Sequence, residues 1–322
     1  MNLILVGDVT PIQRTGSYKY ISYSISEEVM KIINDADIFI GNLETTITDT
    51  NEYDQMKMVS YKIPVAKASR IIDMFSYVNI ANNHILDYGY QGMIDTIDYL
   101  NKKKIYHTGA GDNINDTMAH VIINKNDKKV GVFSATDHPA EWRCDSNRRG
   151  CVNYLEFGSE KSLGVIRKIV NDIRRENIDL IIFSYHYGPN YKDDVDVYKE
   201  FMYKILMEGV DVIHGHSAHH INKISKFRID GRNKYVIYSN GEFINDYGWD
   251  SPEKTEYKMD HTMMVKLKVE KDDVHLSVIP IKINYTYTND QSYYAGVKSA
   301  RVDLMSDFGE KEYIYNVIKR ID

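Results

Sequence analysis

The sequence lacks any uninterrupted apolar run of the roughly 18 residues that a membrane-spanning helix requires. It opens on Asn2-Leu-Ile-Leu-Val-Gly7, which follows no basic region and is too short for the apolar part of a signal peptide. We therefore expect no transmembrane segment and, by default, a cytoplasmic protein. Association with the cell surface is the alternative if the sequence is part of a longer chain.

Cysteine and clustered positive charge are also scarce. Cys144 and Cys151 are close enough in sequence to form a bridge, but two cysteines in 322 residues make neither a disulfide framework nor a thiolate zinc site. The formal net charge is −6, and the longest run of basic side chains is 102–104. This pattern argues against a nucleic-acid partner.

Apolar segments alternate with amphipathic ones over most of the chain, as in a globular α/β protein. Strands are predicted at 3–6, 37–41, 77–81 and 178–186, helices at 26–33, 65–75, 92–104, 159–177 and 195–208, and a hairpin at 119–135. The polar stretch 45–58 is predicted to be a loop over the site. From residue 234 the pattern is strand-rich, which favours a closing sheet over another parallel unit. We expect one domain over residues 1–250, with 251–322 completing it.

Four of the eleven histidines fall within the segment 211–220, directly after an apolar run that predicts the end of a buried strand. They are His214, His216, His219 and His220. Imidazole is the commonest transition-metal ligand, and crowded neutral rings are readily reconciled by a shared cation. Taken alone, the stretch is explained equally well by a surface loop.

Polar side chains also follow the predicted strands. In chain order they are Asp8, Asn42, Glu44, Asn82, Asn83, His84 and His186. Because ligands bind at the carboxyl ends of strands in open α/β sheets, we expect these donors to meet the histidines there. Carboxylate, amide and imidazole suit Mn, Zn or Fe better than Ca, and a bridging carboxylate would allow one or two divalent ions. His138, beside Trp142 near another strand end, contacts the substrate or belongs to an ordinary loop.

The order of these short motifs resembles one family. Gly7-Asp8, Asn42-Leu-Glu44, Asn82-Asn-His84, His186-Tyr-Gly188 and Gly215-His216-Ser-Ala-His219 are similar to the CapA (PGA_cap, bacterial capsule synthesis) family of the calcineurin-like metallophosphoesterase superfamily. Thr108-Gly-Ala-Gly111, Asp137-His-Pro139 and Asn240-Gly-Glu-Phe-Ile-Asn-Asp246 extend the match. The resemblance implies a four-layer α/β/β/α sandwich with a metal centre at the sheet ends, and an association with poly-γ-glutamate capsule production.

The resemblance also implies roles for single residues. Asp8 matches the first metal ligand, Glu44 stands at the bridging carboxylate, and Asn83 binds metal. His84 acts near the scissile phosphate as general acid or transition-state stabiliser, so His84 and Asp8 are the expected catalytic residues. The later ligands are His186, His216 and His219, with His220 as the alternative to His219. His214 is expected to support the turn, and the expected substrate contacts are Asn42, Asn82, His138, Tyr187 and His220.

Three departures from the superfamily pattern bear on metal number and identity. The first motif is usually Asp-x-His, and here Thr10 stands two residues after Asp8. The second motif ends in Asp rather than Glu44, and the common family form Gly-His-His-Pro-His is replaced by Gly-His-Ser-Ala-His over 215–219.

From these observations we expect a metal-dependent hydrolase that acts on a phosphate ester. One alternative is a subunit for synthesis or processing of poly-γ-glutamate. The other is a non-catalytic scaffold that binds metal or polymer. The substrate is accordingly a small molecule or a polymer, and the sequence does not specify an oligomeric state.

Overall fold

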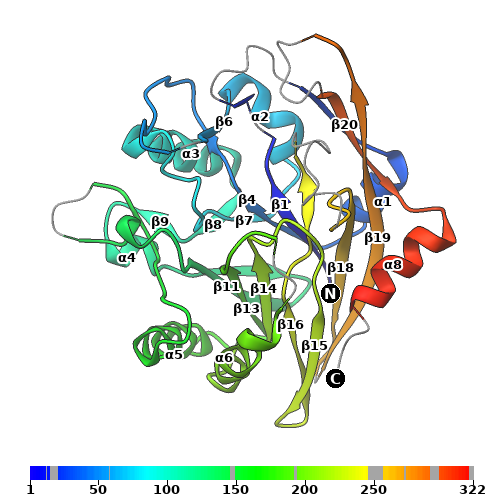
Figure 1. The fold of residues 1–322 in the computed structure, drawn as a ribbon. Helices are drawn as coiled ribbons and strands as arrows, with labels where there is room; N and C mark the ends of the chain where they lie inside the picture. Colours follow the sequence, from blue (N-terminus) through cyan, green and yellow to red (C-terminus); the bar gives the residue numbers. More distant parts are fainter. Residues whose placement is uncertain are drawn as a thin grey trace.

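Two large sheets lie face to face in the computed structural model, and helices cover their outer faces (Figure 1). The structure describes residues 1–11, 13–14, 21–57, 59–145, 149–191, 194–245, 257–271, 273–290 and 297–318. Within these ranges the layers follow the order helices, sheet, sheet, helices. The predicted four-layer α/β/β/α sandwich is therefore confirmed.

The first sheet has the strand order β3-β20-β19-β18-β1-β4-β7-β8, with β17 pairing with β1. Its strands are β1 (Asn2–Val9), β3 (Ser22–Ile25), β4 (Ile38–Leu43), β7 (Tyr77–Asn79), β8 (Tyr106–Thr108), β17 (Glu242–Ile244), β18 (His261–Val269), β19 (Val274–Tyr287) and β20 (Val297–Leu304). β1 pairs in parallel with β4 and β17. β18 and β19 join antiparallel, as expected for a closing sheet.

The second sheet has the order β10-β11-β13-β14-β16-β15. Its strands are β10 (Val121–Lys125), β11 (Lys128–Thr136), β13 (Leu180–His186), β14 (Val212–His216), β15 (Ile224–Ile229) and β16 (Arg232–Ile237). β10 and β11 form the predicted hairpin, whose turn residues Asn126 and Asp127 adopt φ of 49° and 57°. Left-handed turn residues of this kind are typical of Asn and Asp in tight hairpins.

The layering follows from strands that are apolar on both faces. In β1, Leu3 and Leu5 join the core between the two sheets, whereas Ile4 and Val6 face the helices. In β13, Leu180 and Ile182 take the inner face, and Ile181 and Phe183 the outer one. Because successive side chains alternate across a strand, a continuous apolar run predicts burial on both sides.

The outer helices fall into two groups. Helices α1 (Glu27–Asn34), α2 (Val65–Ile72) and α3 (Gly89–Lys103) pack on the first sheet, and α5 (Glu160–Arg174) and α6 (Asp196–Met207) pack on the second. Helix α1 begins where predicted, with the Ser26 hydroxyl accepting a hydrogen bond from the amide of Val29. Two other helices are α4 (Ile114–Thr117) and α8 (Phe308–Ile318).

The expected loop 45–58 was only partly correct. It contains β5 (Thr46–Ile47), which joins β6 (Tyr61–Ile63) and β2 (Gln13–Arg14) in a small sheet. Its partners lie in distant segments, so no local periodicity marks it. A second small sheet pairs β9 (Ala110–Gly111) with β12 (Cys151–Val152), and Cys151 forms a disulfide with Cys144. Among the described residues no helix is both long and apolar enough to cross a membrane.

Candidate metal centre

Sheet register brings polar residues from both sheets to one edge. In the first sheet Asp8 lies opposite Asn42 on β4 and opposite Glu242 on β17. In the second sheet His186 at the end of β13 lies opposite His216 at the end of β14. Because β1 continues to Val9, Asp8 lies within the strand rather than after it, and the pairing with β4 shifts register between Leu5 and Asp8.

Among the described residues, four buried side chains form a group that could hold a metal ion: Asp8, Glu44, His219 and Glu242, whose candidate ligand atoms lie within 4.8 Å of one another. The Nδ1 atom of His219 is 2.6 Å from Glu242 Oε1, 3.7 Å from Asp8 Oδ2 and 3.9 Å from Glu44 Oε2. On the other side of Asp8, His216 Nδ1 lies 3.5 Å from Oδ1.

Glu44 connects this group to a second set of donors. Its Oε1 atom lies 3.8 Å from His186 Nε2 and 3.9 Å from His84 Nε2. His186 Nε2 is also 3.0 Å from the Asn83 side-chain oxygen. A carboxylate between two sets of donors is the arrangement that lets one residue serve two cations.

Burial sets the electrostatics of the centre. Desolvation, reinforced by Glu242, raises the pKa of Asp8 to about 7. Desolvation together with Asp8 and Glu242 raises the pKa of Glu44 well above its ordinary value. Burial also holds the pKa of His186 and of His216 well below the usual range, so both rings are neutral at pH 7.

The donor set fits a divalent cation. The atoms Asp8 Oδ2, Glu44 Oε1, Glu44 Oε2 and His216 Nδ1 are buried and have no hydrogen-bond partner among the described residues. Buried carboxylate oxygens without donors are costly unless a cation compensates them. Neutral imidazoles beside carboxylates are ligands suited to Mn, Zn or Fe.

A histidine–aspartate pair stands next to the centre. His84 Nδ1 lies 2.6 Å from Asp87 Oδ2, and the Tyr61 ring stacks on the imidazole with centroids 3.9 Å apart. Desolvation lowers the pKa of His84 to about 4, so the ring is neutral at pH 7. With its Nδ1 proton held by Asp87, the ring presents Nε2 toward Glu44 as a proton acceptor.

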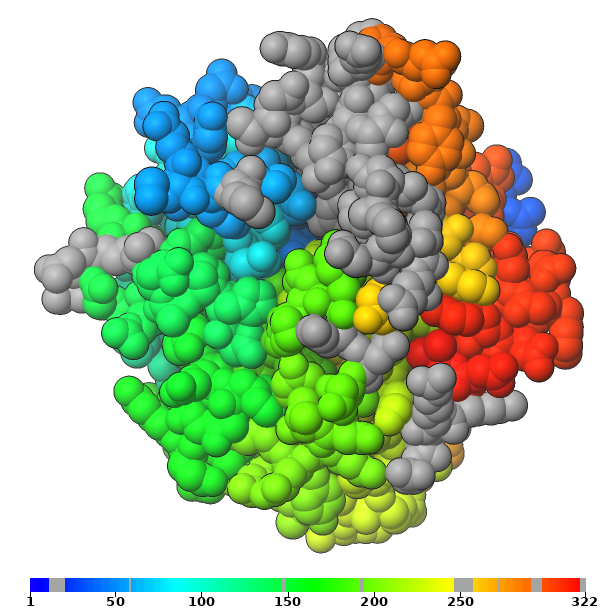
Figure 2. Space-filling view, viewed as in Figure 1, coloured from blue at the N-terminus to red at the C-terminus, as the bar shows by residue number. Residues whose placement is uncertain are grey.

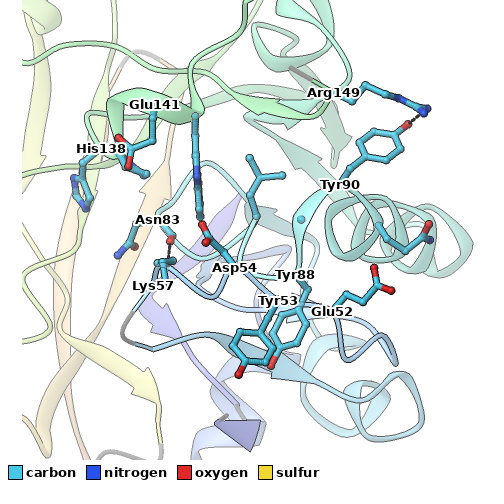
Figure 3. Close-up of a pocket in the computed structure, with 15 residues that line it drawn as sticks. Glu52, Tyr53, Asp54, Lys57, Asn83, Tyr88, Tyr90, His138, Glu141 and Arg149 are labelled. Atoms are coloured by element: carbon cyan, nitrogen blue, oxygen red, sulfur yellow. Dashed lines mark hydrogen bonds between the residues drawn. The ribbon is translucent and has the colours of Figure 1, made fainter. Parts of the chain in front are cut away.

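A groove of about 780 Å³ leads away from Asn83 and His138. Glu52, Tyr53, Asp54, Lys57 and Tyr88 line one part of it, and His138 and Glu141 line another (Figure 3). Arg149 donates to the Tyr90 hydroxyl at 3.2 Å farther along the groove. The chain region around Lys57, blue in Figure 2, and the region around His138, green in Figure 2, meet on the face shown there. The groove is large enough for the non-reacting part of a substrate to lie beside the centre.

A family model described as "Bacterial capsule synthesis protein PGA_cap" matches residues 2–247. The chain belongs to this family. A probable polyglutamine synthesis accessory protein of Mycobacterium tuberculosis is 30% identical over 224 residues, which cover 66% of this chain and 56% of that protein. The capsule biosynthesis protein CapA of Bacillus anthracis is 26% identical over 77% of this chain and 61% of its own length. This PGA_cap chain therefore spans less than two thirds of either relative.

Two of the solved structures that match this chain come from Thermus thermophilus. A hypothetical protein has a TM-score of 0.49 at 9% identity, covering 87% of this chain and 98% of its own. A 5'-nucleotidase precursor has a TM-score of 0.48 at 10% identity, covering 99% of this chain and 58% of its own.

The structure gathers most of the PGA_cap residues expected at the site. Those at or beside the centre are Asp8, Glu44, Asn83, His84, His186, His216 and His219. Asn42 is also there, but it is fully buried and donates to Asp8 Oδ1 at 2.7 Å. Asn82 is buried below it and donates to the Asn42 side-chain oxygen at 3.1 Å. Both amides therefore brace the centre from within the protein.

The remaining expected residues are divided. His138 lines the groove, beside a cis bond to Pro139, with Nδ1 2.5 Å from Asp137. Tyr187 is buried among the aromatic rings under the second sheet, with its hydroxyl directed to the carbonyl of Tyr238. His214 is buried against the His216 ring, and its pKa is lowered to about 3 by burial. Asp246, the end of the last motif, lies outside the described residues.

Glu242 is the residue that motif reasoning did not assign. It lies within a quoted motif, but its place beside Asp8 depends on the parallel pairing of β1 with β17, 234 positions apart in the register Asp8↔Glu242. Thr10, the departure from the expected first motif, donates to Glu242 Oε2 at 3.2 Å. That departure is the signal in the sequence that another side chain could stand beside Asp8.

The choice between His219 and His220 gives a prediction. The His219 ring joins the cluster, whereas the His220 ring stacks on Tyr257 with centroids 4.4 Å apart and its Nδ1 lies 2.9 Å from the Ile221 carbonyl. We expect His219→Ala to lower bound metal per chain, measured by elemental analysis after dialysis, and His220→Ala to leave it unchanged. Equal metal loss in both variants would contradict this assignment.

Proposed function

We propose that this chain is a metal-dependent hydrolase that acts on a phosphate ester. The observation that carries the proposal is the buried group Asp8, Glu44, His219 and Glu242. The Asp8 Oδ2 and Glu44 oxygens of this group have no hydrogen-bond partner among the described residues, and Glu44 lies next to His186 and the His84–Asp87 pair. When bound, a divalent cation such as Mn, Zn or Fe would supply positive charge for phosphate oxygens and lower the pKa of a coordinated water.

The side chains have separable roles in this proposal. Asp8, Glu44, Asn83, His186, His216, His219 and Glu242 would hold one or two cations. His84 would take a proton from the attacking water through Nε2 and then give it to the leaving oxygen, while Asp87 keeps the opposite ring nitrogen protonated. Asn42 and Asn82 would hold Asp8 in place.

The test combines metal analysis with a substrate panel. The purified protein is analysed for bound metal, stripped with a chelator, reloaded with Mn, Zn or Fe singly, and assayed on phosphomonoesters and phosphodiesters. We expect bound metal and turnover that depends on reloading. Bound metal without turnover of any ester would favour the non-catalytic scaffold, and absence of both would refute the proposal.

A second candidate is synthesis or processing of poly-γ-glutamate, favoured by the names of the relatives and by the open groove. Lys57 and Arg149 in the groove would attract a polyanion, whereas Glu52, Asp54 and Glu141 would repel it. The discriminating measurement is the length of poly-γ-glutamate after incubation with the metal-loaded protein. Shortening of the polymer without ester turnover would replace the first candidate by this one.

The disulfide bears on location. We infer from the Cys144–Cys151 bridge that the protein works in an oxidising compartment such as the cell surface, since such bonds are rare in the cytosol. Intact cells are treated with a thiol-alkylating reagent, and the protein is then isolated and analysed by mass spectrometry. We expect both cysteines to carry no alkyl group. Alkylation of both residues would instead support the cytoplasmic location.

A further inference from the structure

Lys57 lies in the groove wall, where Figure 3 shows it bonded to Asn83, and its amino group also reaches the histidine–aspartate pair. Its amino group donates to the carboxylate of Asp87 and to the main-chain carbonyl of Asn83. It lies 3.4 Å from His84 Nδ1 and 5.0 Å from the centroid of the Trp142 ring. One side chain thus contacts both members of the pair and the far wall of the groove.

The charge of Asp87 explains why such a contact matters. Asp87 is fully buried, and its Oδ2 atom is shared between the Tyr61 amide at 2.7 Å and His84 Nδ1 at 2.6 Å. Among the described residues Lys57 is its only permanently cationic partner. A buried carboxylate that loses its cation is expected to move toward water.

The segment that carries Lys57 is held to the groove by few contacts. The amide of Asp54 donates to the carbonyl of Asp87 at 2.9 Å, and the Tyr53 and Tyr88 ring centroids lie 6.1 Å apart. The amide of Met56 donates within the segment, to the Asp54 side chain at 2.9 Å. The Tyr53, Glu52 and Met56 side chains are exposed. Lys57 is therefore the charged link between this surface segment and the buried pair.

We propose that Lys57 is a positioning residue, whose ammonium group fixes Asp87 in the orientation that directs His84 Nε2 toward the centre. Because Lys57 belongs to the segment 52–57, seating this segment in the groove wall completes the histidine–aspartate pair. The kinetic part of this inference rests on the proposed phosphate-ester hydrolysis, but the structural part does not.

Lys62 provides a matched control. It lies on β6, donates to the Thr50 carbonyl at 2.6 Å and to the Asn51 side chain at 2.8 Å, and stands 5.1 Å from the Tyr88 ring. It therefore anchors residues 50–51, which lead into the segment 52–57, and among the described residues it contacts neither His84 nor Asp87. Lys57→Met removes the link to the pair, whereas Lys62→Met removes only an anchor of the chain before the segment.

The kinetic experiment compares Lys57→Met, Lys57→Arg and Lys62→Met with the parent protein, each checked for bound metal and thermal unfolding. We expect Lys57→Met to lower kcat by about 10- to 100-fold, as is usual for loss of a supporting partner, with a smaller change in KM. Lys57→Arg, which keeps the charge, should recover part of kcat. Lys62→Met should leave kcat unchanged, and any effect it has should be on KM. Equal effects on kcat in Lys57→Met and Lys62→Met would overturn the inference, because both would then act only through the segment.

A spectroscopic readout separates this inference from the proposed function. In metal-free protein labelled with ¹⁵N-histidine, the short His84–Asp87 hydrogen bond is expected to give a downfield imidazole N–H proton, assigned by its absence in His84→Asn. The signal should persist in Lys62→Met and disappear in Lys57→Met. Its persistence in Lys57→Met would refute the positioning role. If the parent protein turns over no phosphate ester but the signal still depends on Lys57, the proposed function fails and the positioning role stands.

Discussion

Replacing Asp8 with Asn, or Glu242 with Gln, is expected to weaken divalent-cation binding by roughly 10²–10³-fold. Each change removes one charged partner of a buried ionic group, which costs about 3–5 kcal/mol, and each 1.4 kcal/mol is a factor of about ten in affinity. Titration of chelated protein with Mn or Zn by calorimetry measures the effect. Thr10→Val, which removes only the hydroxyl that donates to Glu242 Oε2 at 3.2 Å, is the control and should weaken binding far less.

In metal-free protein the same Asp8→Asn change should raise the stability of the fold near pH 7. Burial and Glu242 raise the pKa of Asp8 to about 7, so the folded protein holds a proton that the unfolded chain releases near pH 4. The stability of chelated protein should therefore fall as the pH rises from about 4 to 7 and then level off. Thermal unfolding of chelated Asp8→Asn should lack this part of the fall. If the unfolding temperatures of the metal-free parent and of Asp8→Asn depended on pH in the same way, Asp8 would not be the group that holds the proton.

Replacing His84 with Asn is expected to lower kcat on phosphate esters by about 10²–10⁴-fold, the usual contribution of a general acid–base group. Asn keeps a hydrogen-bond donor near Asp87 but cannot accept and return a proton at the position of Nε2. The measurement is kcat for the best ester of the panel, with elemental analysis of the same preparation. Bound metal should be retained, because His84 lies 3.9 Å from Glu44 but outside the four-residue group.

Two other outcomes would change the role of His84. Parallel loss of metal and activity would make it a ligand rather than a proton carrier. Unchanged kcat would remove it from the chemistry altogether. Tyr61→Leu offers a control for the packing of the ring, since it removes the aromatic face stacked on His84 at 3.9 Å but leaves the main-chain amide that binds Asp87.

Much of the fold could be predicted because its signals are local. Apolar runs such as 3–6 and 178–186 predict strands buried on both faces, and β1 and β13 contribute to the cores on either side of their sheets. Ser26 marks the start of α1. Strand β5 was not predicted because it is two residues long and pairs with β6 in another segment. Strand β20 and helix α8 were also not predicted, although β20 pairs with the preceding β19.

By itself the sequence determined which donors exist and at which strand ends they occur. Parallel strands in one sheet direct their carboxyl ends to one edge, so Asp8 and Glu44, at the ends of the neighbouring strands β1 and β4, had to lie near one another. His186 belongs to the second sheet, and only the packing of the two sheets brings it to them. Only the tertiary structure decided that Glu242 joins them, that His219 rather than His220 faces Asp8, and that Lys57 reaches Asp87. Ser217 and His219 adopt φ of 88° and 62°, a chain reversal that side-chain spacing does not reveal. These contacts depend on sheet register and loop path, which are set by packing between distant segments and leave no periodic trace in the sequence.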